Sequence, residues 1–502
     1  MARQSKILFN MRPILFLVIF LPAFLAAQNI QDRPSPPSRG DFSPIHSFLS
    51  SDWMEGRETG TRANAMAGDY VASMMQLSGL KPFGDGGSWF QHFEVVRYDV
   101  AGASLSMTVE GPGGVTTTTF TPGSDFTLDT VPYSGEGEAG LVFAGYGIEM
   151  PELGYDSYGG ADVQNKVLLI LEGFPGHLDT TTAPGKDFQK EFGDKADAFS
   201  KKMDLARKKG AAAVIYVETP ESAETTRPDE PWYEDYWYYL PGGSPGKHIP
   251  CFKSSPETAP LLFNSLEAIL ANGVKIRYAV TLKQEAVAVR NVLGLIPGRD
   301  TTRYLLVGAH YDHLGKRNDL IYNGADDNAS GVAGMLALAK WWAAFPEKPA
   351  CNLVFAAWAA EEKGVLGSEY FSINPPVASE GLSLVINLDM ISRSAPEDTA
   401  RQIVSIGTLP ANGDLRDIAI RSNAGLEKPF SLDLWDVSGH CGSDYCHFAA
   451  ANIPVMTFFS GFHEHYHSPG DIFSCADPAK MEKILKIVND CIAEGSLIKR
   501  GK

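Results

Sequence analysis

YLLVGAHYDH, residues 304–313, is an apolar run that stops at two histidines and an aspartate. Short apolar runs rich in Val, Leu, Ile and Phe are typical of strands buried on both faces of a parallel sheet. Three similar runs follow along the chain, at Leu353–Ala360, Leu384–Leu388 and Ile453–Phe459, and helical patterns such as Ser330–Ala344 lie between them. This alternation predicts a three-layer α/β fold, in which a mixed, mostly parallel sheet carries helices on both faces.

Residues that can bind a metal or move a proton follow each of the four runs. They are His310 and Asp312 after the first, Glu361 and Glu362 after the second, Asp389 after the third and His467 beyond the fourth. Asp326 and Asp327 precede the predicted helix, where carboxylates are favoured. In open α/β sheets ligands bind outside the carboxyl ends of the strands, so these groups are expected to meet at one edge. Each position alone more often marks a capped strand end. Together they form a set suited to a pair of zinc ions.

Five sequence blocks resemble, in order and spacing, the metal-site blocks of the M28 family of co-catalytic zinc aminopeptidases. The blocks are GAHYDHLG (308–315), GADDNASG (324–331), AAEEKG (359–364), NLDM (387–390) and YHSPGD (466–471). The resemblance runs from Asn291 to about Asp471. GRETGT at 56–61 is similar to the family's N-terminal segment, and residues 134–280 resemble the small α/β protease-associated domain often inserted in this family.

The resemblance implies a zinc exopeptidase-like fold and a role for each ligand. The implied ligands are His310 and Asp389 for one zinc ion, Glu362 and His467 for the other, and Asp327 as the bridge between the two ions. Asp312 would lie behind His310 and fix its tautomer, for which the H-x-D spacing is well suited. A cis peptide bond between Asp327 and Asn328 is implied as well.

The resemblance also separates the roles of the two adjacent glutamates. With Glu362 on the metal, Glu361 would act as the general base that takes a proton from a metal-bridging water and delivers it to the leaving amine. Tyr466 would donate its hydroxyl to the oxyanion, with simple packing beside the site as the alternative. His440 falls where certain relatives place an oxyanion-binding tyrosine. Arg393 is expected either to contact substrate or to form an ordinary salt bridge.

Length and charge bound the remaining possibilities. The chain has 502 residues, more than one hydrophobic core usually supports, and a formal net charge of −17. The charge excludes a general basic surface for nucleic acid or anionic lipid. The expected segments are a signal peptide (1–27), a flexible leader (28–40), the first part of the peptidase domain (41–133), a protease-associated insert (134–280) and the di-zinc peptidase domain (281–502).

The first residues are expected to direct export. A basic start and an apolar run that ends at Ala27 are typical of a secretory signal peptide, with cleavage near Ala27. No later stretch is long and apolar enough to span a membrane. The expected location is therefore the periplasm or the medium. In such an oxidising compartment Cys441 and Cys446, close in sequence, are the best candidates for a disulfide.

An acidic insert at residues 218–247 is rich in tryptophan and tyrosine. It could form a lid or an interface, and a loop packed on its own domain is at least as plausible. The sequence leaves its role open, together with the oligomeric state.

The predicted function is that of an exported di-zinc exopeptidase that removes N-terminal residues from peptide substrates. Three alternatives differ in metal content. A glutaminyl cyclase-like acyltransferase would hold one zinc, and a receptor-like binding module would hold none. The third is a zincin, because His463, Glu464 and His467 formally match H-E-x-x-H. That motif needs a helix, and Gly461 and Pro469 make a helix improbable here.

Overall fold

The computed structural model describes most of the chain from residue 33 to residue 499. The described ranges are 33–111, 114–128, 133–177, 183–192, 195–218, 236–243, 248–254, 258–265, 269–271, 273–317 and 319–499. The predicted signal peptide and most of the aromatic insert lie outside these ranges. Among the described helices, none combines the length and the apolarity that crossing a membrane requires.

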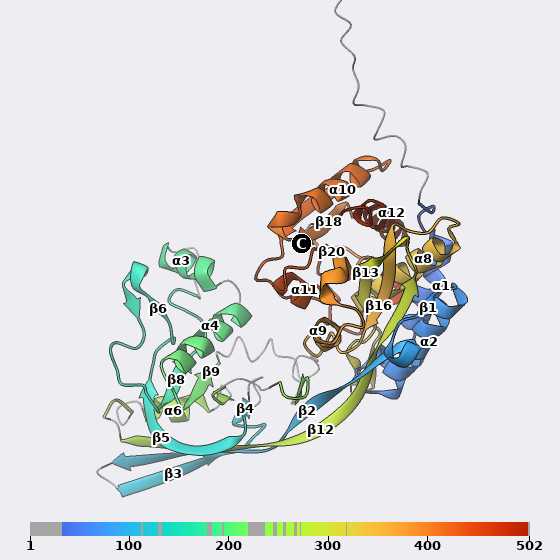
Figure 1. Ribbon diagram of the computed structural model, residues 1–502. Helices are drawn as coiled ribbons and strands as arrows, with labels where there is room; N and C mark the ends of the chain where they lie inside the picture. The colour runs from blue at the N-terminus through green and yellow to red at the C-terminus, as the bar shows by residue number, and fades with distance from the viewer. Residues whose placement is uncertain are drawn as a thin grey trace, which may run out of the picture.

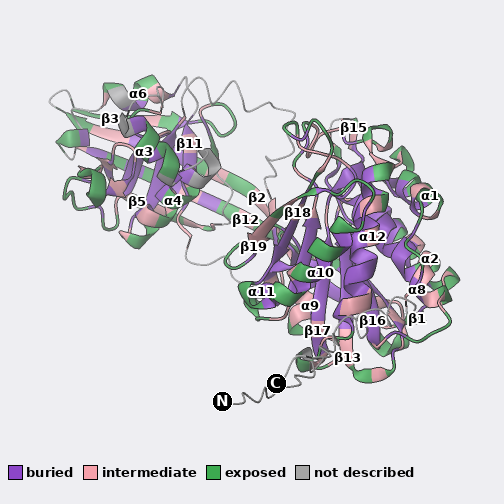
Figure 2. Ribbon diagram, turned by 90° about the horizontal axis from the view of Figure 1, so that it is seen from above, coloured by how far each residue is buried: buried purple, intermediate pink, exposed green. Residues whose placement is uncertain are grey.

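The described residues form two lobes joined by the long antiparallel strands β2 (Phe90–Gly111) and β12 (Val274–Ile296), which run from one lobe into the other (Figure 1). The larger lobe contains the chain before β2 and after β12. The smaller lobe is built mainly from the chain between them. Buried residues gather within each of the two lobes (Figure 2).

The larger lobe contains the predicted sheet. Its strands lie in the order β19 (Ser431–Asp436), β18 (Ile403–Thr408), β20 (Val455–Phe459), β17 (Leu382–Leu388), β13 (Asp300–His310), β16 (Cys351–Trp358) and β12. The four strands predicted from apolar runs, β20, β17, β13 and β16, are adjacent and parallel. The pairs β18–β20 and β12–β16 are antiparallel. The prediction of a mixed, mostly parallel sheet is confirmed.

Alternate residues of the central strands feed two cores, one on each face of the sheet. Leu305 and Val307 of β13 pack in the core that also contains residues of α1 (Arg39–Leu49), α2 (Arg62–Leu77), α8 (Gly331–Ala344), α10 (Gly413–Ala424) and α12 (Pro478–Gly495). Leu306 packs in the core of the other face, with residues of α9 (Leu366–Ile373) and α11 (Cys446–Ala450). The larger lobe therefore has the three layers that the pattern predicts.

The smaller lobe is also an α/β unit. Its sheet continues from β12 through β5 (Gly135–Phe143), β8 (Val167–Leu171), β9 (Ala213–Val217) and β11 (Cys251–Ser254) to β4 (Phe126–Leu128). Helix α4 (Lys195–Lys208) packs beside one face, and β3 (Gly114–Phe120) pairs with β2. Most described residues of the range 134–280 lie within this lobe, except β10, which packs on the larger lobe. The smaller lobe's core also contains Leu105 and Met107 of β2. Packing of the smaller lobe thus begins ahead of residue 134, because β2 passes through both lobes.

The remaining described strands and helices are short or lie at the edges of the lobes. They are β1 (Lys81–Pro82), β6 (Glu149–Met150), β7 (Tyr155–Asp156), β10 (Tyr236–Tyr239), β14 (Gly315–Arg317), β15 (Leu320–Tyr322), α3 (Ala183–Phe192) and α6 (Ala259–Asn264).

The part of the expected leader that the structure describes is not free. Arg33 forms an ion pair with Asp490 of α12, and the side-chain amide of Asn489 donates to the carbonyl of Pro34 at 3.0 Å. Helix α1 begins at Arg39 behind a capping box formed by Ser38 and Asp41. The expectation of a flexible leader is therefore wrong for residues 33–40, because an ion pair, a hydrogen bond and a helix start hold them.

Separate cores predict separate effects on stability. Replacing the buried Ile215 of β9 by Ala should destabilise the smaller lobe by about 2–5 kcal/mol through lost burial and a cavity. Phe355→Ala in β16 is the matched change in the larger lobe. Calorimetry of the two variants should show different transitions shifted. If both variants showed a single unfolding transition, shifted by the same amount, the two lobes would not unfold independently and the prediction would be wrong.

Candidate metal centre

The predicted ligand residues lie at one edge of the larger lobe's sheet, where its parallel strands end. His310 is the last residue of β13, Asp389 directly follows β17, and Glu362 comes shortly after β16. Asp327 lies in the short helical segment that leads into α8, and His467 lies in a turn beyond β20. This is the convergence that the polarity of the strands predicts.

Asp327 lies between two groups of donor atoms. Its Oδ1 is 3.3 Å from Nε2 of His310, and the same nitrogen is 3.4 Å from Oδ1 of Asp389. Its Oδ2 is 3.1 Å from Nε2 of His467, which is 3.2 Å from Oε2 of Glu362. Each group has its donor atoms within 4.8 Å of one another. One carboxylate therefore faces both groups.

His313 joins the second group, a role that sequence reasoning missed. Its Nδ1 is 2.6 Å from Oε1 of Glu362 and 3.8 Å from Oδ2 of Asp327, and the side chain is fully buried. A signal was present, because the block that contains His310 carries a second histidine three residues later. Only the folded chain shows that this imidazole turns back toward Glu362.

The donor set fits zinc. Imidazole nitrogens and carboxylate oxygens are common zinc ligands. The carboxylates of Asp327, Glu361, Glu362 and Asp389 gather here with little solvent exposure. Buried carboxylates repel one another and are costly unless positive charge faces them. Divalent cations would compensate this charge.

The pKa values of His467 and His310 reflect the same negative potential. Burial would lower the pKa of His467, but Glu362 and Asp327 raise it to about 10. Burial also opposes a charge on His310, yet Glu361 and Asp389 raise its pKa well above the ordinary value. A field that favours positive charge on a buried imidazole also favours a metal cation in that place.

Three ligand segments contain a residue with left-handed backbone. His467 has a φ of 51°, Ala360, just before Glu361, has 57°, and Met390, just after Asp389, has 51°. For residues other than glycine such conformations cost of the order of 1–3 kcal/mol and cluster at functional sites. The left-handed backbone at these three residues therefore accompanies the placement of the site's side chains at the strand ends.

The loop that carries Asp327 is held by Asp471. The Asp471 carboxylate accepts hydrogen bonds from the backbone amides of Asp326 at 3.0 Å and Asp327 at 3.1 Å. The peptide bond between Asp327 and Asn328 is cis, as the family resemblance implies. The block that supplies His467 therefore also positions the shared carboxylate.

Asp312 acts differently from the sequence prediction. Nδ1 of His310 lies 3.2 Å from the main-chain carbonyl of Asp312 and 3.9 Å from its carboxylate, so the carbonyl makes the closer contact. The carboxylate accepts from the amides of Glu361 at 3.1 Å and Glu362 at 3.3 Å, and from the hydroxyl of Thr59 at 2.8 Å. A buried carboxylate is satisfied by such donors, and these hold the turn that carries both glutamates.

Arg57 of the GRETGT segment is fully buried beneath the site. Its guanidinium donates to the carbonyls of Tyr311 at 2.9 Å, Asn323 at 2.7 Å and Gly324 at 3.0 Å. Burial lowers its pKa to about 10, and the Asp327 carboxylate opposes this lowering most strongly. Arg57 thus connects the segment that follows His310 to the segment that precedes Asp327, and it adds positive charge beneath both.

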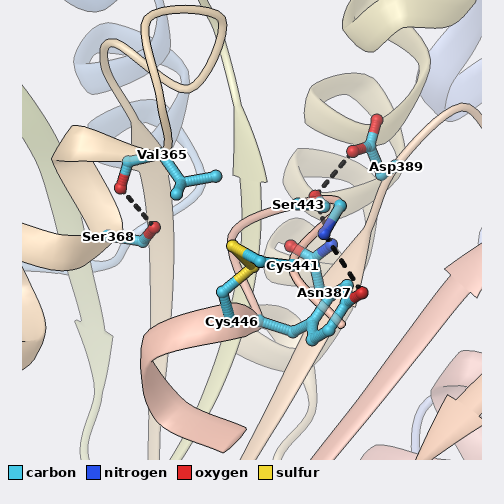
Figure 3. The surroundings of a disulfide bond; sticks show 9 residues. Val365, Ser368, Asn387, Asp389, Cys441, Ser443 and Cys446 are labelled. Atoms are coloured by element: carbon cyan, nitrogen blue, oxygen red, sulfur yellow. Dashed lines mark hydrogen bonds between the residues drawn. A yellow bond between two sulfur atoms is a disulfide. The ribbon is translucent and has the colours of Figure 1, made fainter. Parts of the chain in front are cut away.

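A disulfide joins Cys441 and Cys446, the pair predicted from the sequence (Figure 3). It closes the loop that carries Ser443, whose hydroxyl donates to Oδ2 of Asp389 at 2.6 Å. The side-chain amide of Asn387 in turn donates to Ser443 at 2.8 Å. Hydrogen bonds of this kind orient a ligand carboxylate.

A cavity of about 300 Å³ opens beside the donor groups. Its lining residues share an aromatic or apolar character away from the carboxylates, and include Met390, Trp435, Tyr445, Phe459, Phe462 and Tyr466. His440 also lines it, and the prediction that His440 is a possible substrate contact stays a prediction. No lysine or arginine is among the described lining residues.

Two other sequence candidates lie away from this cavity. Nη1 of Arg393 is 3.5 Å from Oδ1 of the buried Asp471, so the salt-bridge alternative holds for this residue. His463 faces Asp326 and Asp471, with Nε2 3.6 Å from an oxygen of each, and Glu464 is exposed. The segment forms turns and no helix. The zincin alternative is therefore wrong, because the motif's two histidines do not share a helix face.

Comparison with known proteins agrees with this geometry. The model of "Peptidase family M28" matches residues 291–492, which include every donor residue above. Over that region the chain is similar to peptidase family M28. The matched region contains all five sequence blocks, which resemble the family more specifically together than any one of them does alone.

Relatives and solved structures extend the M28 comparison. A "Probable zinc metalloprotease" from Pyrenophora teres f. teres is 40% identical over 117 residues, 22% of this chain and 24% of the relative. "Leupeptin-inactivating enzyme 1" from Streptomyces exfoliatus is 30% identical over 174 residues, 34% and 36% of the two chains. The chain thus spans well under two thirds of the length of these curated relatives. The solved aminopeptidase from Aneurinibacillus sp. strain AM-1 shares the fold, with a TM-score of 0.59, 18% identity and coverage of 92% of this chain and 94% of that one.

Loss of the Ser443 hydroxyl should weaken metal binding. Ser443→Ala leaves one oxygen of Asp389 without its donor, and changes of this kind typically reduce metal affinity about 10- to 100-fold. Competition with a chelating dye measures the effect. Ser438→Ala, an exposed position in the same loop, should bind metal as the wild type does. Equal affinities in both variants would remove Ser443 from this role.

Proposed function

We propose that the chain is an exported di-zinc exopeptidase that removes N-terminal residues from peptides. The observation that carries the proposal is the Asp327 carboxylate, which faces two groups of donor atoms and lines the cavity described above. A shared carboxylate of this kind suits two metal ions better than one. Export rests on the basic and apolar residues 1–27.

The chain's own residues divide naturally between two zinc ions. His310 and Asp389 would hold one, Glu362 and His467 would hold the other beside His313, and Asp327 would serve both. When bound, zinc polarises a carbonyl and lowers the pKa of water, which makes attack on a peptide bond feasible near neutral pH. The family model that matches residues 291–492 is also that of a peptidase family.

Glu361 is placed to move the proton. It lines the cavity, its Oε2 lies 3.8 Å from Nε2 of His310, and its backbone amide is held by Asp312. Burial and then the carboxylates of Asp444 and Glu362 raise its pKa well above the ordinary value. A carboxyl group that protonates readily can take a proton from the attacking water and return it to the departing amine.

Tyr466 is placed to donate to the oxyanion. Its ring stacks on His467 at 3.9 Å between centroids and lines the cavity. Burial, and then the carboxylates of Asp327 and Glu362, raise its pKa. The phenol therefore keeps its proton and remains a hydrogen-bond donor where negative charge develops.

The cavity favours an N-terminal residue with an apolar or aromatic side chain. Trp435, Phe459 and Phe462 offer apolar surface, and burial of such a side chain contributes about 1.5–3 kcal/mol. The carboxylates in the lining suit a positively charged terminal amine. The described lining offers no lysine or arginine for a terminal carboxylate, which argues against a carboxypeptidase.

Aminoacyl and dipeptide substrates with varied first residues test this function directly. Leu, Phe and Met at the first position should be cleaved fastest, and chelation should abolish turnover in parallel with the loss of two zinc ions per chain. Glu361→Gln should lower kcat by about 10²–10⁴ while zinc content stays near two, because it removes a base and not a ligand.

Glu464→Gln is the matched control, because Glu464 is an exposed glutamate. It should remain active. An essential Glu464 with a dispensable Glu361, or a chain that holds a single zinc ion, would contradict the proposed function.

Tyr466→Phe should lower kcat with little change in KM or zinc content. The hydroxyl would act on charge that develops only in the transition state, and removal of one such donor costs about 10²–10³ in rate. His440→Ala is the parallel variant, since His440 also lines the cavity. A normal kcat in the Tyr466 variant with a collapse in the His440 variant would transfer the oxyanion role to His440.

A further inference from the structure

Strand β10 belongs to the aromatic insert, yet it lies on the linking strand β2. Tyr236–Tyr239 pairs antiparallel with β2 at Val96–Asp99. The pairing of β2 with β12 shifts register between Thr281 and Leu282, opposite Val100 and Gly102. Strand β10 therefore joins the ribbon on the larger-lobe side of this bulge, although β9 before it and β11 after it belong to the smaller lobe.

Alternation gives the two faces of β10 different neighbours. Tyr238 packs in the main core of the larger lobe, and Tyr236 packs against that core. Trp237 lines a small cavity with Cys251 and Val280 of the smaller lobe. Tyr239 stands edge-on to Tyr98 at 5.8 Å between centroids. The face with Tyr236 and Tyr238 is therefore turned toward the larger lobe.

Tyr236 contacts the segment that lies beneath the metal centre. Its hydroxyl donates to Oε1 of Glu58 at 2.6 Å. Arg317 holds the same carboxylate through two hydrogen bonds, at 2.8 and 2.7 Å. Burial would raise the pKa of Glu58, but Arg317, Lys363 and Tyr236 lower it, so the carboxylate stays charged. Charge-assisted hydrogen bonds such as these are among the stronger ones.

Glu58 and Tyr236 both contact Lys363, the residue after the adjacent glutamates of the site. Its Nζ lies 3.7 Å from Oε1 of Glu58, 5.1 Å from the ring centre of Tyr236 and 5.9 Å from that of Tyr238. The Lys363 side chain is 2% exposed. An ammonium group enclosed by a carboxylate and two aromatic faces is held in place.

A second connection runs through the backbone. Glu58 forms a β-bridge with His313, and His313 binds Glu362 through Nδ1 at 2.6 Å. Strand β10 thus reaches Glu362 by two short routes, through Lys363 and through Glu58 with His313. Both routes use buried or half-buried groups.

We propose that β10 is a strap that anchors the smaller lobe to the metal centre, with Tyr236 as a positioning residue that acts through Glu58 and Lys363 on the turn of Glu361 and Glu362. The strap makes the position of the smaller lobe and the geometry of this turn interdependent. Anything that lifts β10 from Glu58 loosens the turn and the metal held by Glu362.

The test compares two tyrosines of one strand. Tyr236→Ala removes the contacts to Glu58 and Lys363, Tyr236→Phe removes only the hydroxyl, and Tyr239→Ala alters the opposite face. Tyr236→Ala should speed zinc release into a chelator about tenfold and lower kcat about tenfold with KM nearly unchanged. Tyr236→Phe should show a smaller effect in the same direction, and Tyr239→Ala should match the wild type.

Hydrogen exchange on the zinc-free protein provides a readout that needs neither metal nor activity. Amides of residues 359–365 should exchange faster in Tyr236→Ala than in Tyr239→Ala, at a temperature well below unfolding of either variant. Equal exchange and equal zinc release in the two alanine variants would overturn the strap. The inference rests on the ligand assignment of the proposed function. If the chain bound zinc but lacked peptidase activity, the proposed function would be wrong and the strap would still be testable, because hydrogen exchange and zinc release do not depend on activity.

Discussion

The burial of the Asp327 carboxylate between two histidines is the constraint on which the rest of the site depends. Its two oxygens lie 3.3 Å and 3.1 Å from the Nε2 atoms of His310 and His467. A carboxylate removed from water is costly unless donors or positive charges face both of its oxygens. Three other carboxylates gather around it, which deepens the need for positive charge. This cluster of buried carboxylates is therefore expected to be most stable when it binds cations.

Much of the surrounding structure serves to hold backbone near this group. Asp471 accepts the amides of the Asp327 loop, and Asp312 accepts those of the glutamate turn. Arg57 donates hydrogen bonds to main-chain carbonyls beneath the site, and Ser443 donates one to the carboxylate of Asp389. Each is a buried polar group whose own satisfaction requires the loops to lie where they do. The strained backbone beside three ligands is the cost of this arrangement.

The two lobes add a second level of organisation. The long strands β2 and β12 connect them, and a register shift interrupts the ribbon between the lobes. A bulge bends the strand that carries it and increases the local twist. The contacts of β10 with Glu58 and Lys363 lie on the larger-lobe side of that bulge. They give the smaller lobe a fixed point close to the metal centre, which the ribbon alone would not provide.

The sequence by itself determined the larger lobe's sheet and the ligand types. Local patterns suffice for these, because a buried strand must be apolar along its length and must end in polar residues at a site. Tertiary structure alone decided which groups meet across long distances in the chain. In the folded chain His313 contacts Glu362, and Arg393 forms an ion pair with Asp471. The carbonyl of Asp312 is the closer neighbour of His310. Tyr236 donates to Glu58, which lies 178 residues away in the sequence. These pairings depend on how loops from different strands pack, and no local pattern encodes the direction in which a loop side chain finally points.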